Sequence, residues 1–327
     1  MAEFLPTASN VHRPGKSWER QWAVKQGLKS AGRLLRRMPH EPETSTPPPD
    51  LPPARVLWVP GRGEIFVREQ EGPEDALPVL LLHGWTASAD TTWFAVYPRL
   101  ADHHPLIAMD QRGHGRGIRA EEPFSLEACA EDAASLLELL EIRRVIVAGY
   151  SLGGAVAMLM WKHHRDLVAG LVLAGTALEW RATPRERMLW RTLGVFEFLL
   201  RLGTGDGFVQ RYLHYAVGHA PDVADLRAWV GGEFKRGFPQ DIAEAGRALS
   251  RFDSREFIGK IDVPCASVVT ERDRLVREHE QRQLAEALGG KVFSVDGDHD
   301  APLVKPDEFS SAVLAAVEHV AELAREG

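Results

Sequence analysis

The chain is poor in cysteine, in long apolar runs and in positive charge, and each of these absences excludes a class of protein. Only two of its 327 residues are cysteines, Cys129 and Cys265, and their spacing fits neither a disulfide framework nor a metal site, so both are expected to be buried free thiols. No apolar run approaches the ~20 residues that cross a bilayer, and the N-terminus lacks the apolar core of a secretory signal. The net charge of −7 argues against a nucleic-acid partner. A cytoplasmic protein without a metal or cofactor is therefore expected.

Positive charge is nevertheless concentrated in the first forty residues, which carry +6 while the remainder carries −13. Apolar side chains recur there three or four residues apart, as on one face of a helix, and basic side chains lie off that face. These apolar positions are Val24, Leu28, Ala31, Leu35 and Met38. Because Trp18 and Trp22 precede them, the pattern predicts peripheral contact of residues 17–38 with an anionic membrane surface. Packing across the main domain and a partly ordered tail are the alternatives.

The organisation of the chain changes at a run of prolines. Six of them lie between Pro42 and Pro53 and indicate a stiff linker, so residues 1–54 are predicted to be a basic arm with its linker. Beyond Arg55, short apolar runs that suit strands alternate with segments of helical length. The predicted strands are 56–59, 65–68, 79–82, 105–110, 145–149, 170–174, 263–270 and 292–295, and the predicted helices are 125–141, 155–161 and 306–324. This alternation predicts an α/β core with a mostly parallel sheet and helices on both faces, over residues 55–176 and 259–327.

A long insertion interrupts this alternation late in the sheet. About ninety residues follow the strand at 170–174 without a convincing strand of their own, so a helical cap is predicted over residues 177–258. Its aromatic residues include Trp190, Phe196, Phe198, Phe208, Tyr212, Tyr215 and Trp229. Together they predict an apolar substrate chamber between the cap and the sheet.

The most informative stretch is Gly149-Tyr150-Ser151-Leu152-Gly153, a G-x-S-x-G pattern. Such a pattern also occurs by chance in glycine-rich turns. Here an apolar strand precedes it and a helical segment follows it, which is the setting of a nucleophile elbow. The sharp turn brings backbone close to the serine, so side chains at 149 and 153 would collide. Ser151 is therefore the candidate nucleophile.

A serine hydroxyl needs a base to take its proton, and a carboxylate to orient that base. In this type of sheet the three groups follow in the order Ser, Asp, His, each beyond a strand end. Asp273 comes just after the strand at 263–270, and His299 just after the strand at 292–295. The histidines at 214, 219 and 279 lack such a position. Asp273 and His299 therefore complete the predicted triad.

The tetrahedral intermediate of acyl transfer also needs two hydrogen-bond donors for its negative oxygen. One is expected to be the backbone N–H of Leu152, directly after the serine. The other is expected from the loop after the strand at 79–82, where His83-Gly84-Trp85 offers the N–H of Trp85. His83 is interpreted as a structural turn residue. Tyr150, beside the nucleophile, is the candidate substrate-binding residue.

These motifs resemble the α/β-hydrolase superfamily, in particular its single-chain esterases and monoacylglycerol-lipase-like members. The resemblance covers about residues 55–325. It is carried by Leu82-His83-Gly84-Trp85, Asp110-Gln111-Arg112-Gly113-His114-Gly115, Gly149-Tyr150-Ser151-Leu152-Gly153-Gly154 and Gly297-Asp298-His299. It implies the same triad and the same two oxyanion donors, and it makes the segment around His114 a structural turn.

The resemblance implies a hydrolase that cleaves small hydrophobic esters through an acyl-enzyme, without a cofactor or metal. Epoxide hydrolases and haloalkane dehalogenases of this fold carry an aspartate where Ser151 stands. The menaquinone-pathway lyase carries an arginine where Ala155 stands. Carbon–carbon bond hydrolases or lyases and cofactor-free haloperoxidases or perhydrolases use the same triad and stay open. A non-catalytic scaffold of the same fold is the third alternative.

Overall fold

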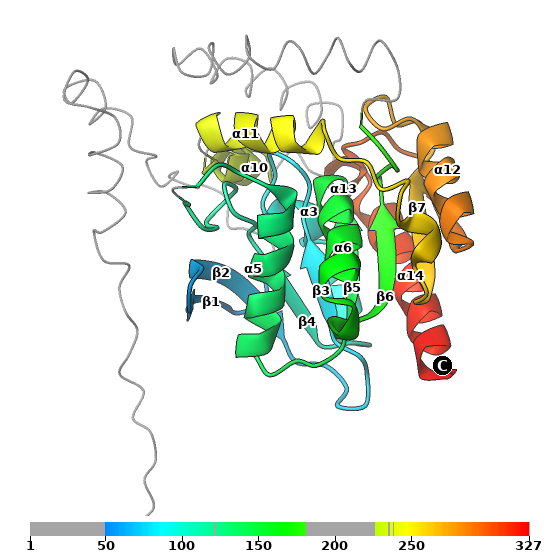
Figure 1. Ribbon diagram of the computed structural model, residues 1–327, viewed down its shortest axis with the longest axis horizontal. Helices are drawn as coiled ribbons and strands as arrows, with labels where there is room; N and C mark the ends of the chain where they lie inside the picture. The colour runs from blue at the N-terminus through cyan, green and yellow to red at the C-terminus, as the bar shows by residue number, and fades with distance from the viewer. Residues whose placement is uncertain (1–49, 121, 181–225, 235, 238, 327) are drawn as a thin grey trace, which may run out of the picture. The chain divides into compact units, whose positions relative to one another are not determined.

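The computed structural model describes residues 50–120, 122–180, 226–234, 236–237 and 239–326. Residues 1–49 of the predicted arm, which include the membrane-contact segment at 17–38, lie outside these residues, as do the cap aromatics from Trp190 to Tyr215. The described part contains an eight-stranded sheet in the order β1-β2-β4-β3-β5-β6-β7-β8 (Figure 1). Its strands are β1 (Ala54–Val59), β2 (Gly63–Gln70), β3 (Val79–Leu82), β4 (Leu106–Met109), β5 (Val145–Tyr150), β6 (Val168–Ala174), β7 (Cys265–Thr270) and β8 (Lys291–Val295).

The sheet is parallel except at one end. β1 and β2 form an antiparallel hairpin, and β2 pairs antiparallel with β4. All further neighbours are parallel, and Val79 of β3 pairs with Leu106 on one side and Ile146 on the other. β3 is fully buried, as its continuous apolar run predicts for a strand covered on both faces. The predicted mostly parallel sheet is confirmed, and the carboxyl ends of β3, β5, β7 and β8 open on one edge.

Helices cover both faces of this sheet. In the described residues they are α3 (Ala89–Trp93), α4 (Val96–Ala101), α5 (Leu126–Leu139), α6 (Leu152–His163), α10 (Arg227–Phe234), α11 (Pro239–Leu249), α12 (Glu278–Leu288), α13 (Ala301–Val304) and α14 (Pro306–Glu326), with short 3-10 helices η2 (Arg165–Leu167) and η4 (Ile258–Lys260). α5 begins where its sequence predicts, because the Ser125 side chain caps it by accepting the Ala128 N–H at 3.1 Å.

Successive side chains of the strands point to opposite faces of the sheet and pack into two separate hydrophobic cores. Leu80 and Leu82 of β3 point into a cluster with α5 and α6. Val79 and Leu81 point into the other, with α3, α4 and α14, where Phe309 is fully buried. In Figure 1, α5 and α6 lie in front of the sheet and α14 lies behind it. This period-two alternation is what places helices on both faces.

The insertion between β6 and β7 begins and ends at one place. Glu179 and Asp253 form an isolated antiparallel bridge, and the Ser254 N–H donates to the Leu178 carbonyl at 2.9 Å. Within the insertion, the described residues form the helices α10 and α11. Trp229 of α10 is buried, with its ring centroid 5.7 Å from that of Phe94 in the core.

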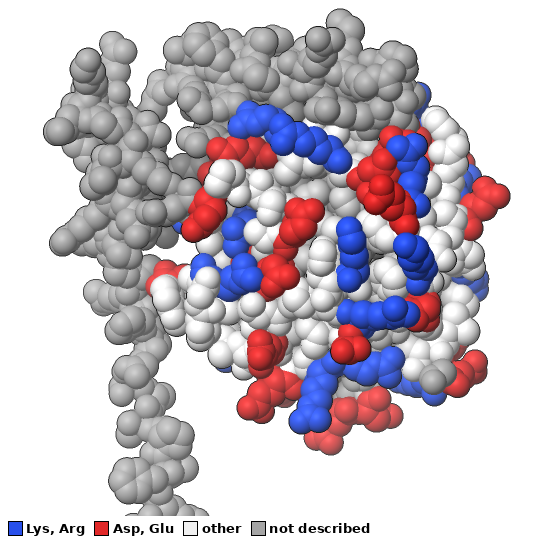
Figure 2. Space-filling view, in the orientation of Figure 1, with Lys and Arg blue, Asp and Glu red and all other residues white. Residues whose placement is uncertain are grey.

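The outer surface gives no sign of a single-sign charge patch on the face that carries α5 and α6. Figure 2 shows lysines and arginines interspersed there with aspartates and glutamates. Among the described helices, none has the length and apolar character to cross a membrane. Cys129 and Cys265 are free and buried, as predicted, and burial raises the pKa of the Cys265 thiol to about 12.

Candidate active site

Ser151 lies in the sharp turn between β5 and α6, with φ 55° and ψ −115°. This positive φ is rare for a residue with a side chain and is held by its surroundings. A Cβ on Gly149 would lie 2.2 Å from the Gly153 carbonyl oxygen, and one on Gly153 would lie 2.1 Å from the Leu82 carbonyl oxygen. Both contacts are with backbone, so only glycine fits at either position. The predicted strand, sharp turn and helix are thus present around Ser151.

The structure brings the three predicted triad residues into one hydrogen-bonded row. Ser151 Oγ lies 2.9 Å from His299 Nε2, and His299 Nδ1 lies 2.8 Å from Asp273 Oδ2. They come from the ends of β5, β8 and β7, which the parallel sheet gathers on one edge. Because a carboxylate only accepts, Nδ1–H donates to Asp273, and Nε2 is left to accept the serine proton.

Asp273 is held by more partners than the sequence indicated. Its Oδ1 accepts the N–H groups of Leu275 and Val276 at 2.9 and 2.8 Å. Its Oδ2 accepts the Thr270 hydroxyl at 2.8 Å and the Gln281 amide at 3.1 Å, besides the imidazole. Sequence reasoning missed Gln281, since it lies on α12, where no local motif marks it. Four donors thus hold the carboxylate in place against the imidazole.

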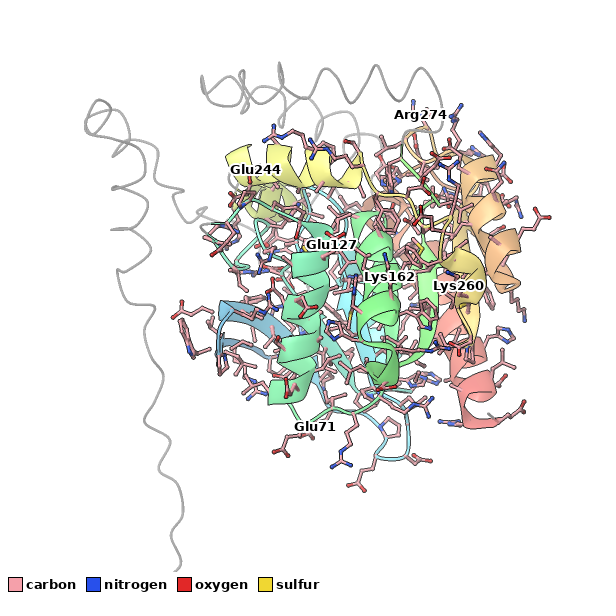
Figure 3. The ribbon with its side chains drawn as sticks, viewed as in Figure 1. Glu71, Glu127, Lys162, Glu244, Lys260 and Arg274 are labelled. Carbon is pink, nitrogen blue, oxygen red and sulfur yellow. The ribbon has the colours of Figure 1, made fainter. Side chains whose placement is uncertain are left out.

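The imidazole of His299 sits among negative charges. Burial lowers its pKa, but the Asp273 carboxylate and its hydrogen bond, with Asp298 and Asp300 nearby, outweigh burial and raise the pKa above 6.5. Asp298 is itself tied down, because it accepts the Arg274 guanidinium at 2.5 Å and the His299 backbone N–H at 2.8 Å. Arg274 projects from the loop after β7, at the upper right of Figure 3. This environment favours the imidazolium that forms when the serine gives up its proton.

The loop after β3 lies against the nucleophile, as the oxyanion prediction requires. A Cβ on Gly84 would lie 3.2 Å from Tyr150 Cδ1 and 3.4 Å from the Ser151 Cβ, so the backbone of this loop runs directly beside Ser151. The Gln111 N–H donates to His83 Nε2 at 2.9 Å, which leaves His83 Nδ1–H to donate to the Gly84 carbonyl at 2.8 Å. That carbonyl belongs to the same peptide as the Trp85 N–H, so His83 orients the predicted donor. Burial lowers the pKa of His83, in keeping with this neutral structural role.

Leu152, the other predicted donor, is the first residue of α6. The N–H groups of a helix's first turn have no acceptor within the helix. They point out of its N-terminus, where the helix dipole also favours negative charge. The arrangement can therefore stabilise an oxyanion formed next to Ser151.

Tyr150 lies under the catalytic loop. Its hydroxyl donates a short hydrogen bond to the His299 carbonyl, and its ring centroid lies 5.3 Å from that of His299 and 5.4 Å from that of Phe309. The side chain is buried. These contacts support the His299 loop, and the predicted contact of Tyr150 with substrate stays a prediction.

A buried ionic cluster beside the loop was not foreseen from the sequence. Asp110 accepts the Ala89 N–H and the Arg116 guanidinium, both at 2.8 Å, and Arg116 also reaches Asp90 at 3.0 Å. Burial raises the pKa of Asp110, but Arg116 and His83 outweigh it and lower the pKa to about 2. Burial lowers the pKa of His114 to about 3, in keeping with the interpretation of Arg112-Gly113-His114-Gly115 as a structural turn. Among the described residues no three His, Cys, Asp or Glu side chains form a group that could hold a metal ion.

The sequence resembles known proteins over most of its length. A family model described as alpha/beta hydrolase fold matches residues 78–306. A pimeloyl-[acyl-carrier protein] methyl ester esterase of Neisseria meningitidis is 28% identical over 251 residues, which cover 75% of this chain and 95% of that protein. The 2-hydroxy-6-oxo-6-(2'-aminophenyl)hexa-2,4-dienoic acid hydrolase of Metapseudomonas resinovorans is 27% identical over 260 residues, 76% of this chain and 86% of that protein.

A solved structure agrees with the architecture. A thermophilic esterase from Thermogutta terrifontis superposes with a TM-score of 0.69 over 82% of this chain and 99% of that chain. The two sequences are 23% identical, so this likeness concerns the fold.

Proposed function

The chain belongs to the α/β-hydrolase family, and from that premise we propose that it is a serine hydrolase that cleaves carboxylic esters with an apolar acyl or alkyl group through an acyl-enzyme. One observation carries the proposal. Ser151, His299 and Asp273 form a hydrogen-bonded row of 2.9 and 2.8 Å, with the serine in a strained turn at a helix N-terminus. Such a row turns a weakly nucleophilic hydroxyl into an effective one.

In the first half of the reaction, Ser151 Oγ attacks the ester carbonyl carbon while His299 Nε2 takes its proton. The carbonyl oxygen becomes negative and accepts hydrogen bonds from the backbone N–H groups of Trp85 and Leu152. Asp273 stabilises the imidazolium. The intermediate then collapses, the C–O bond to the alcohol breaks, and the imidazolium gives its proton to the departing alkoxide.

In the second half, water takes the place of the alcohol. His299 Nε2 accepts a proton from the water as its oxygen attacks the acyl-enzyme carbonyl. Collapse of this second intermediate breaks the bond to Ser151 Oγ, which recovers its proton from His299 and releases the acid. The cycle consumes one water and needs no other reactant.

The bond type and the polarity of the substrate rest on two further arguments. Ester cleavage is supported by the relative from Neisseria meningitidis, which is named a methyl ester esterase. An apolar acyl or alkyl group is supported by the aromatic residues that the sequence places in the cap. A chain-length series of p-nitrophenyl esters, extended with methyl esters, is the measurement that narrows the substrate most.

The test replaces the nucleophile. We expect Ser151→Ala to lower kcat on p-nitrophenyl esters by about 10⁴-fold or more and to abolish labelling by a fluorophosphonate, with the circular dichroism spectrum unchanged. Ser311→Ala is the matched control, because Ser311 lies on α14 and donates only to the nearby Asp307 carbonyl. Unchanged turnover in the Ser151 variant would exclude the mechanism. No turnover and no labelling of the wild-type chain would favour a non-catalytic scaffold.

Cleavage of a carbon–carbon bond is the second candidate function. It is favoured by the relative from Metapseudomonas resinovorans, which is named a hydrolase of a 2-hydroxy-6-oxo-dienoic acid. The two functions differ in their products. Turnover of such a dienoic acid at a rate well above that of every ester in the panel would favour the second candidate.

A further inference from the structure

The loop from His83 to Ser88 joins the predicted oxyanion donor to the start of α3. The first part of this loop is fixed from the side of the core, because the His83 side chain donates a hydrogen bond from Nδ1 to the Gly84 carbonyl at 2.8 Å. Two other side chains of this loop turn the opposite way, toward the helices of the insertion. They are Trp85 and Ser88.

Trp85 reaches α11. Its indole Nε1–H donates to the Ile242 backbone carbonyl at 2.8 Å, across 157 residues of sequence. The rest of the indole is partly buried against the core cluster that contains α5 and α6. The residue that offers the backbone N–H for the oxyanion is therefore also bonded, through its side chain, to a cap helix.

Ser88 reaches α10. Its hydroxyl donates to Glu233 Oε2 at 2.9 Å while it caps α3 by accepting the Thr91 N–H at 3.3 Å. Glu233 is only 5% exposed, and a buried carboxylate of this kind is stable only when it is paired. Its further partners are Arg236 at 2.9 Å and Arg116 at 3.3 Å. Through Arg116 the cap carboxylate joins the Asp110 and Asp90 cluster described above.

We propose that the side chains of Trp85 and Glu233 are positioning residues that couple the seating of the cap to the geometry of the oxyanion hole. The inference rests on the proposed function. The core binds this short loop at the Gly84 carbonyl, and the cap helices bind it at the side chains of Trp85 and Ser88. When α10 and α11 are seated, the Trp85 N–H is aimed at the oxyanion; when either bond is lost, that donor moves. A displacement of about 1 Å in a positioned group costs on the order of 10²-fold in rate.

Three variants test the coupling on the full chain, beside two control variants. Trp85→Phe removes the indole N–H but keeps an aromatic ring and the backbone donor. Glu233→Ala removes the acceptor of Ser88, and Glu233→Gln keeps an acceptor oxygen while losing the charge. Glu244→Ala is the matched control for Glu233→Ala. Glu244 on α11 also accepts a hydrogen bond from the core, from the Phe124 N–H at 3.2 Å, but Phe124 lies outside the loop. Figure 3 labels Glu244 on that helix.

A second control serves the tryptophan. Trp161 lies on α6, outside the loop, and its indole N–H donates to Asp262 at 3.2 Å. Trp161→Phe therefore also removes a hydrogen-bonded indole N–H. Each variant is assayed for kcat and KM on one p-nitrophenyl ester and for the inhibition constant of an alkyl trifluoromethyl ketone, whose adduct with Ser151 carries the same oxyanion. The measured rates are divided by the fraction of folded protein, so that a loss of stability alone does not lower the reported kcat.

We expect Trp85→Phe and Glu233→Ala to lower kcat about 10- to 100-fold with KM changed less than about twofold, and to weaken ketone binding by the same factor as kcat. Glu233→Gln should recover most of the activity. Both controls should match the wild type. Variants whose kcat and ketone binding match those of the controls would overturn the coupling while leaving the proposed function standing. A wild-type chain that neither cleaves the ester nor binds the ketone would overturn the proposed function and the coupling with it.

Discussion

His299 shows how a single side chain is tuned by its neighbours. Its imidazole is buried, which by itself lowers the pKa, yet the carboxylates of Asp273, Asp298 and Asp300 raise the pKa above 6.5. As the proposed base, His299 must be neutral to accept the serine proton. Activity should therefore be lost as pH falls through this raised pKa, and the acid limb of kcat/KM against pH reports it.

Removing one of the carboxylate charges near His299 should move the acid limb of the pH–rate profile. Asp300 raises the pKa of His299 through its charge and makes no side-chain cap to α13. In Asp300→Asn the imidazolium loses a stabilising charge, so its pKa falls, and we expect the acid limb of kcat/KM to shift to lower pH. A pH–rate profile of variant and wild type measures the shift.

Asp296→Asn is the control for that profile. Asp296 lies in the same loop but pairs with Arg272, at 2.5 Å, and is not one of the groups that shift the pKa of His299 most. Its limb should stay with that of the wild type. A shift of the Asp300 variant to higher pH, or an equal shift in both variants, would contradict this assignment of the charges.

At the scale of elements, the junction of β5 and α6 is tightly constrained by the backbone around it. Gly153 belongs to α6, where alanine is ordinarily the better residue by about 1 kcal/mol. Here the methyl group would meet the Leu82 carbonyl oxygen of β3 at 2.1 Å. The helix starts so close to the sheet that intrinsic helix preference is overruled by packing.

We therefore expect Gly153→Ala to lower the free energy of unfolding by about 1–3 kcal/mol or more, since backbone must separate to admit the methyl group. Gly259→Ala is the matched substitution at an open site in η4, with no atom within 4 Å of the added Cβ, and it should be neutral or slightly stabilising. Urea unfolding of the two variants measures the difference. Equal stabilities would show that the junction has more room than this geometry allows.

The same scale separates the elements that could be predicted from those that could not. Strands with continuous apolar runs and the long helices α5 and α14 were predicted within a few residues, because burial of a whole face leaves a periodic record. α3 and α4 were not predicted. They span five and six residues, which is too short for a helical period, and α3 is held by the Ser88 cap and the Asp110 contact to Ala89.

At the scale of the whole molecule, the acidic core and the basic arm differ in the surfaces they can approach. The prediction that residues 17–38 contact an anionic membrane rests on their charge, their apolar stripe and Trp18 and Trp22. Attraction to anionic lipid and burial of apolar area add in such a helix. We expect the full chain to float with vesicles that contain phosphatidylglycerol, and a chain starting at Leu51 to stay at the bottom of the gradient.

Salt and lipid charge supply the controls for this flotation. The electrostatic part should weaken at high ionic strength, and vesicles of phosphatidylcholine alone should carry less protein. Equal flotation of the full chain and of the chain starting at Leu51 would remove the arm as the contact.

The sequence by itself determined the fold family, and it predicted the sharp turn at Ser151 and the order of the three candidate triad residues, because strand ends, glycines and reactive side chains are recognisable from local sequence alone. Tertiary structure alone decided the rest. Gln281 supports Asp273 from a neighbouring helix, Tyr150 bonds the His299 carbonyl, and Trp85 and Ser88 reach α11 and α10. Such contacts depend on where distant segments meet once two cores are packed, and no spacing along the chain encodes them.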